Sequence, residues 1–123
     1  MRSLRKKILI VDDETEFVEM IQMRLEANDY RVVSASNGED GYDLAQTERP
    51  DLILLDVMMP GADGFETLGR LRRSEVTEST PVIMLTARGE TRSIFKAQDL
   101  RVTDYLIKPC ESQELLAMVK KHA

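Results

Sequence analysis

The sequence has little of what marks a secreted, membrane-spanning or DNA-binding protein. Its one cysteine, Cys110, cannot form an internal disulfide, which indicates a reducing, cytoplasmic setting. No hydrophobic run approaches the length of a membrane span, and only the apolar run Ile8–Val11 separates the basic N-terminus from Asp12, too little for a signal-peptide core. The net charge of −5 disfavours duplex DNA as a direct partner, because affinity for DNA rests mainly on neutralising phosphates.

The chain also lacks repeats, low-complexity tracts and linkers. An apolar share of 42% and a charged share of 32% are typical of a soluble globular protein, and 123 residues suffice to bury a core. We therefore expect one domain over residues 1–123.

What the sequence does have is an alternation between the strand and helix periods of hydrophobicity. The pattern predicts strands at Ile8–Val11, Arg31–Ala35, Leu52–Leu55, Val82–Leu85 and Asp104–Ile107. The first of them is a continuous run of β-branched residues and leucine, which predicts burial on both faces. Helices are predicted over Glu14–Asn28, from Asn37 to the residue before Pro50, and over Phe65–Arg73, Thr91–Leu100 and Ser112–Lys121. In the first helix, the spacing places on the buried face Phe17, Met20, Ile21 and Leu25.

This alternation predicts a parallel sheet covered by helices on both faces, with right-handed crossovers. The fold class is α/β, a doubly wound five-stranded parallel sheet with five helices, of the flavodoxin-like type. For this class we expect the strand order 2-1-3-4-5, which places a ligand crevice at the carboxyl ends of the first and third strands.

Polar residues follow four of the predicted strands, at the point where each strand ends: Asp12, Asp13, Asp56, Thr86 and Lys108. Because neighbouring strands lie about 5 Å apart, these side chains meet at one edge of the sheet. Asp56 is the most informative of them, since it ends a buried apolar run, where a charge is costly unless a cation or a chemical step uses it.

Such a cluster favours chemistry on a phosphoryl group. Three carboxylates in one crevice repel each other, and a few oxygen ligands favour Mg²⁺. Thr86 and Lys108 do not suit that cation, but they suit the oxygens of a phosphoryl group. We therefore expect Asp12 and Asp13 to hold Mg²⁺ and Asp56 to form an aspartyl phosphate, which Thr86 and Lys108 neutralise.

Together these motifs resemble the receiver domain of two-component response regulators, and the resemblance covers essentially the whole chain. The motifs are Ile10–Glu14 (IVDDE), Asp56–Gly64 (DVMMPGADG), Leu85–Ala87 (LTA) and Asp104–Pro109 (DYLIKP). Each motif alone is weak, but in this order and at these spacings they are highly specific. The resemblance leaves no room for an output domain in this chain.

The resemblance implies a phosphorylation-dependent signalling switch rather than an enzyme, one that assists only its own phosphorylation and dephosphorylation. A sensor histidine kinase or histidine phosphotransfer protein donates the phosphoryl group to Asp56, and the backbone carbonyl of Met58 joins the Mg²⁺ ligands. Thr86 and Tyr105 then switch together, and helix four, strand five and helix five present a changed surface to a downstream protein. The Lys108–Pro109 peptide is expected to be cis.

The sequence departs from the family pattern at two places. Arg101-Val102 stands where a Gly-Ala pair is usual, so Arg101 is expected to store strain if it keeps the left-handed backbone of that glycine. Cys110 stands where an aromatic residue is frequent. The resemblance also gives Met58 and Arg88 an influence on phosphate loss, and a thioether and an arginine there predict a long-lived phosphorylated state.

Other interpretations stay open. The acids at residues 12–14 suit any helix N-terminus, and Thr86, Tyr105 and Lys108 singly suit ordinary strand-end or packing roles. His122 is expected to be solvated. A flavin-binding protein of the same architecture is disfavoured, because these acids would repel the flavin phosphate. An aspartate-nucleophile phosphohydrolase is disfavoured, because the acids lack the spacing that this class of enzyme uses. The remaining rival is a degenerate receiver that acts as an unphosphorylated protein-interaction module.

Overall fold

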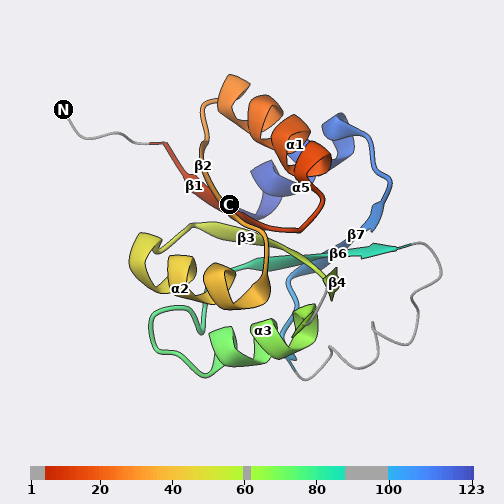
Figure 1. Cartoon of the computed structure of the whole chain (residues 1–123). Coiled ribbons are helices and arrows are strands. Elements are labelled where there is room, and N and C mark those ends of the chain that lie inside the picture. Colours follow the sequence, from red (N-terminus) through yellow and green to blue (C-terminus); the bar gives the residue numbers. More distant parts are fainter. Residues whose placement is uncertain (1–4, 60–61, 88–99) are drawn as a thin grey trace.

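Five parallel strands form the central sheet of the computed structural model, which describes residues 5–59, 62–87 and 100–123 (Figure 1). These strands are β1 (Lys7–Val11), β2 (Arg31–Ala35), β3 (Leu52–Asp56), β6 (Val82–Ala87) and β7 (Asp104–Lys108). Their order across the sheet is β2-β1-β3-β6-β7, which confirms the predicted order. The sequence did not predict a small antiparallel pair, β4 (Met58–Met59) with β5 (Ala62–Asp63).

Helices cover both faces of this sheet (Figure 1). On one face lie α1 (Thr15–Ala27) and α5 (Ser112–His122), and on the other lie α2 (Gly38–Glu48) and α3 (Gly64–Arg72). The helix predicted over Thr91–Leu100 lies, apart from Leu100, outside the described residues. None of the described helices is both long and apolar enough to cross a membrane.

The central strands β1, β3 and β6 are buried because they supply both layers of the core. Alternate side chains of a strand point to opposite faces. In β1, Ile8 and Ile10 pack on the α1/α5 side, whereas Leu9 and Val11 pack on the α2/α3 side. The residues of β3, from Leu52 to Asp56, are all buried. Two-sided burial explains why these strands have continuous rather than alternating hydrophobicity.

Local signals set the ends of α2 as predicted. Asn37 caps its N-terminus, since the Asn37 Oδ1 accepts a hydrogen bond of 2.8 Å from the backbone N–H of Asp40. At the other end, Arg49 adopts a left-handed backbone with φ of 47°, immediately before Pro50. The helix therefore stops where proline forbids its continuation.

Two predictions about single side chains are wrong. Met20 was expected on the buried face of α1, but it is 46% exposed, because Val18, Ile21 and Leu25 form that face. His122 was expected to be solvated, yet its Nε2 lies 2.9 Å from the Asp104 Oδ2 and its side chain is mostly covered. The contact joins the first residue of β7 to the last residue of α5.

One other local prediction is confirmed, since the Lys108–Pro109 peptide is cis. The condition set for strain at Arg101 is also met, because Arg101 has a left-handed backbone with φ of 55°. The Arg101 carbonyl accepts a hydrogen bond of 3.0 Å from the Arg72 guanidinium.

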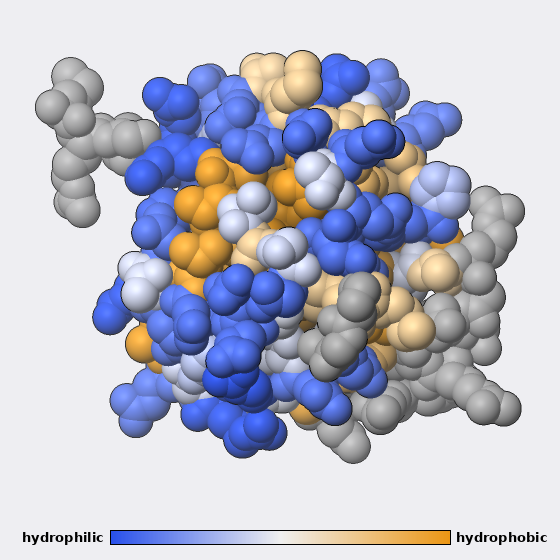
Figure 2. Space-filling model, in the orientation of Figure 1, coloured by the Kyte–Doolittle hydropathy of each residue, from blue (hydrophilic) through white to orange (hydrophobic). Residues whose placement is uncertain are grey.

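The surface is mostly hydrophilic on the face shown in Figure 2. Hydrophobic residues on this face gather in a band between α1 and α2, where the edge strand β2 lies. The half-buried Val32 and Val33 of β2 pack against the two sides of the core.

Candidate functional site

The predicted acids and the predicted lysine meet at the carboxyl edge of the sheet. Asp12 and Asp13 follow β1, Asp56 ends β3 and Lys108 ends β7. The three aspartates can each offer an oxygen such that all three oxygens lie within 4.8 Å of one another. The Lys108 Nζ lies 2.9 Å from the Asp12 Oδ2 and 3.7 Å from the Asp56 Oδ2. Parallel strands in register produce this meeting of residues far apart in the sequence.

Gly64 allows the loop after β3 to fold tightly against Asp56. A Cβ atom added at Gly64 would lie 2.2 Å from the backbone oxygen of Asp56. The Gly64 N–H donates a hydrogen bond of 2.8 Å to the Val57 carbonyl, and α3 begins at the same residue. A side chain at this position would therefore displace the backbone of the acid.

The Asp56 carboxyl group is the most perturbed acid of the site. Burial and then the charge of Asp12 raise its pKa from 3.8 to about 6, against the lowering effect of the Lys108 ammonium. A hydrogen bond of 3.3 Å from the Met58 N–H to the Asp56 Oδ1 also stabilises the carboxylate. A carboxylate held in this way is short of positive charge, and a cation would relieve it.

Lys108 is the counter-ion of the cluster. Burial alone would lower the pKa of its ammonium, but hydrogen bonds to Glu14 and Asp12 and the charges of Asp12 and Asp56 outweigh burial and raise the pKa. The group is therefore a permanent cation at the mouth of an acidic site.

The other predicted residues lie close to this cluster on neighbouring strands. Thr86 is buried in β6, one residue beyond Leu85, which pairs with Asp56 in the sheet register. Tyr105 is half-buried in β7, where it packs against the core on the α2/α3 side, and burial raises the pKa of its phenol. The Met58 side chain is 63% exposed beside Asp56. Arg88 lies outside the described residues.

Sequence reasoning missed two residues that contact Lys108. The Glu14 carboxylate accepts a hydrogen bond from the Lys108 ammonium, and the Phe17 ring centroid lies 4.6 Å from the Lys108 Nζ. Glu14, the acid that directly follows Asp12 and Asp13, was a signal in the sequence. It belongs to the Ile10–Glu14 motif and suits a helix N-terminus, but neither assignment gives it a contact with Lys108.

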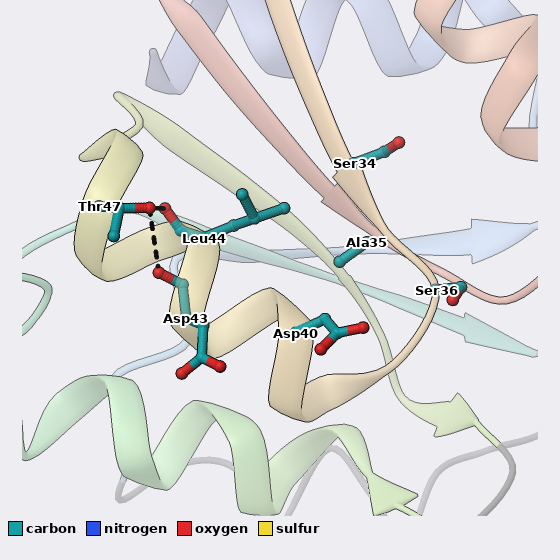
Figure 3. Close-up of a pocket in the computed structure, with 7 residues that line it drawn as sticks. All are labelled: Ser34, Ala35, Ser36, Asp40, Asp43, Leu44 and Thr47. Atoms are coloured by element: carbon teal, nitrogen blue, oxygen red, sulfur yellow. Dashed lines mark hydrogen bonds between the residues drawn. The ribbon is translucent and has the colours of Figure 1, made fainter.

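A second hollow lies away from the predicted residues. A pocket of about 450 Å³ between β2 and α2 is lined by Ser34, Ala35, Ser36, Asp40, Asp43, Leu44 and Thr47 (Figure 3). The Thr47 hydroxyl turns back to the carbonyls of its own helix, at 3.3 Å from Asp43, and Asp40 is engaged by Asn37. No predicted site residue lines this pocket.

The donor set at the carboxyl edge fits a hard cation. Carboxylate oxygens from three residues within 4.8 Å suit a metal that prefers oxygen, and Mg²⁺ takes few protein ligands and keeps several waters. Sheet order, acidic cluster and opposing lysine together define a doubly wound α/β domain with a candidate cation site at the carboxyl edge of its sheet.

Within that class, the family is clear, because residues 8–120 match the response regulator receiver domain and the chain belongs to this family. It is 43% identical to the alkaline phosphatase synthesis transcriptional regulatory protein PhoP of Bacillus subtilis, with 95% of this chain and 48% of that protein covered. It is also 43% identical to the phosphate regulon transcriptional regulatory protein PhoB of Pseudomonas aeruginosa, with 94% and 50% covered. The chain thus spans about half the length of these relatives.

Solved structures agree with this assignment. The chemotaxis protein CheY4 of Vibrio cholerae superposes with a TM-score of 0.91 at 29% identity, over 97% of this chain and 99% of that one. The receiver domain of the sensor histidine kinase PA1611 of Pseudomonas aeruginosa superposes with a TM-score of 0.87 at 28% identity, over 96% and 97%. That structure has a magnesium ion coordinated in its active-site cleft.

Proposed function

We propose that this receiver domain, taken as residues 1–123, is a switch that Asp56 operates by accepting a phosphoryl group. The donor is the phosphohistidine of a sensor histidine kinase or a histidine phosphotransfer protein. An oxygen of the Asp56 carboxylate forms a bond to phosphorus while the bond from phosphorus to the histidine nitrogen breaks, and the imidazole leaves with the bonding pair. The observation that carries this proposal is a buried carboxylate with Lys108 3.7 Å away and two further aspartates beside it.

Each remaining residue has a role in this proposal. The carboxylates of Asp12, Asp13 and Asp56 and the backbone carbonyl of Met58 would hold Mg²⁺, which supplies positive charge to the phosphoryl oxygens. Lys108 donates to the same oxygens, and so does the Thr86 hydroxyl. The domain assists its own phosphorylation and dephosphorylation, and acts in the cytoplasm without binding nucleic acid directly.

The output follows from Thr86 moving toward the phosphoryl group and Tyr105 turning inward. The surface that changes comprises β7, α5 and the helix predicted over Thr91–Leu100, which apart from Leu100 lies outside the described residues. A downstream protein or an attached output domain would bind it, as suits a chain similar to transcriptional regulators.

Incubation with acetyl phosphate tests the chemistry. The wild type should gain one hydroxylamine-labile phosphate in the presence of Mg²⁺, and Asp56→Asn should gain none. Undiminished labelling of Asp56→Asn would refute the assignment of the acceptor. Failure of the wild type to label would favour the degenerate receiver that acts without phosphate.

A groove beside this site supports a docking surface for the protein donor. The groove, of about 270 Å³ next to Lys108, is lined by Glu14, Phe17, Met20, Lys108, Pro109 and Cys110. A second hollow on α1 shares Met20 with this groove and includes Met23, which is 73% exposed. We therefore expect Met20→Lys to slow transfer from a phosphorylated kinase but not from acetyl phosphate. Val76→Lys, at an exposed apolar residue after α3, is the matched control and should slow neither reaction.

A further inference from the structure

Glu14 stands at the N-terminus of α1 without capping it. A residue at this position ordinarily accepts a hydrogen bond from a backbone N–H of the first turn. The Glu14 side chain makes no such bond. Its carboxylate accepts instead from the Lys108 ammonium, while its own N–H donates 2.9 Å to the Asp12 Oδ1. The Asp12 turn therefore aims Glu14 across the mouth of the site toward β7.

Lys108 is held on the α1 side of the site. Its Nζ donates to Asp12 and Glu14 and lies above the Phe17 ring, 4.6 Å from its centroid. The Asp56 Oδ2, at 3.7 Å, is beyond hydrogen-bond distance. An ammonium has three donors, and two of them are used here, so removal of Glu14 would free a donor for the aspartates.

We propose that Glu14 is a positioning residue that draws Lys108 away from Asp56 and so keeps the Asp56 carboxylate open to the divalent cation. The proposal rests on the proposed function, in which Asp56 binds Mg²⁺ together with Asp12 and Asp13. An ammonium and a cation compete for the same carboxylate oxygens and repel each other. Glu14 is a carboxylate outside the cluster, and by pairing with the ammonium it favours binding of the cation. When Asp56 is phosphorylated, Lys108 exchanges Glu14 for the phosphoryl oxygens.

The test is a calorimetric titration of the unphosphorylated protein with Mg²⁺ alone. Glu14→Gln should raise the Mg²⁺ dissociation constant about tenfold, the lower end of the effect of losing a residue that supports metal ligands. Glu14→Asp, which keeps the charge but is one methylene shorter, should weaken binding equally, because it does not reach Lys108. Glu16→Gln removes the same charge from the exposed face of the first turn and should change the constant by less than about twofold.

A second measurement reads Lys108 itself, in protein without metal. The side-chain ammonium signal of Lys108 in a ¹H–¹⁵N spectrum should shift in Glu14→Gln and Glu14→Asp but not in Glu16→Gln. Wild-type affinity in Glu14→Gln, or wild-type affinity in Glu14→Asp beside a loss in Glu14→Gln, would overturn the proposal, as would an unmoved Lys108 signal. If the wild type is phosphorylated as expected but the Glu14 variants do not behave as predicted, the proposed function stands without the role of Glu14.

Discussion

The two ends of the central sheet hold buried charge in opposite ways. At the amino-terminal end, the Arg72 guanidinium donates to the carbonyls of Thr77, Glu78, Thr80, Leu100 and Arg101, at 2.8 to 3.2 Å. At the carboxyl-terminal end, three aspartates cluster, and the ammonium of Lys108 pairs with two of them, Asp12 and Asp56, and with Glu14.

The two ends of the sheet therefore differ in role, because one contributes to stability and the other carries the chemistry. Arg72 joins the end of α3 to the residues before β6 and β7, and its hydrogen bonds need nothing from outside the chain. Asp56 has too little positive charge around it, which is why burial and Asp12 raise its pKa to about 6. We infer that the first end holds the fold together, while the second is unfavourable until a cation or a phosphoryl group arrives.

The largest expected effect comes from removing Arg72. Arg72→Met would leave several backbone carbonyls without their donor, so the free energy of unfolding should fall by about 4 kcal/mol. Urea unfolding measures this loss, and Arg73→Met, at the exposed neighbouring arginine, should cost far less. Phosphorylation of folded Arg72→Met by acetyl phosphate should persist. Equal losses for the two variants would show that the carbonyls are satisfied in another way.

Removing the charge of Asp56, at the carboxyl-terminal end of the sheet, should instead raise the free energy of unfolding. The folded pKa of Asp56, about 6, lies above its ordinary 3.8, so the folded protein holds this proton more tightly and loses stability as pH rises through that interval. Asp56→Asn should therefore be more stable than wild type by about 3 kcal/mol at pH 8, and the difference should vanish near pH 4. Urea unfolding across this range measures both, and a difference that grew toward pH 4 would contradict the sign.

A smaller gain is expected from relieving the backbone at Arg101. With φ of 55°, a non-glycine residue stores strain on the order of 1 kcal/mol, and its charge also opposes Arg72. Arg101→Gly should raise the unfolding midpoint despite the entropy cost of glycine. Arg101→Ala removes the charge but keeps the Cβ, so it separates the two causes. A lower midpoint for Arg101→Gly would mean that strain is not limiting here.

The smallest effect concerns the lifetime of the phosphorylated state. Met58 leaves a thioether beside Asp56 that cannot orient an attacking water, so Met58→Asn should speed phosphate loss about threefold, which is about 0.7 kcal/mol in the barrier. Arg88→Ala should act in the same direction. A phosphate-release time course without kinase or phosphatase checks both, with Met23→Asn as the exposed control. Unchanged rates would show that these side chains do not control the lifetime of the phosphorylated state.

The sequence by itself determined the sheet and the members of the acidic cluster. Continuous apolar runs fixed which segments are strands buried on both faces, and the polar residue after each run fixed what reaches the carboxyl edge. Asn37 and Pro50 marked the ends of α2. These signals are local, because strand and helix periods, caps and proline act within a few residues of chain.

Only the tertiary structure decided which side chains meet across elements. Glu14 and Lys108 stand 94 residues apart, and Arg72 and Leu100 stand 28 apart, so no local pattern could pair them. Met20 at helical spacing looked buried, but α5 and the sheet cover only the stripe of Val18, Ile21 and Leu25. The contact of His122 with Asp104 likewise depends on how whole elements pack. Burial and pairing depend on where whole elements pack, and that position results from the sum of many distant contacts.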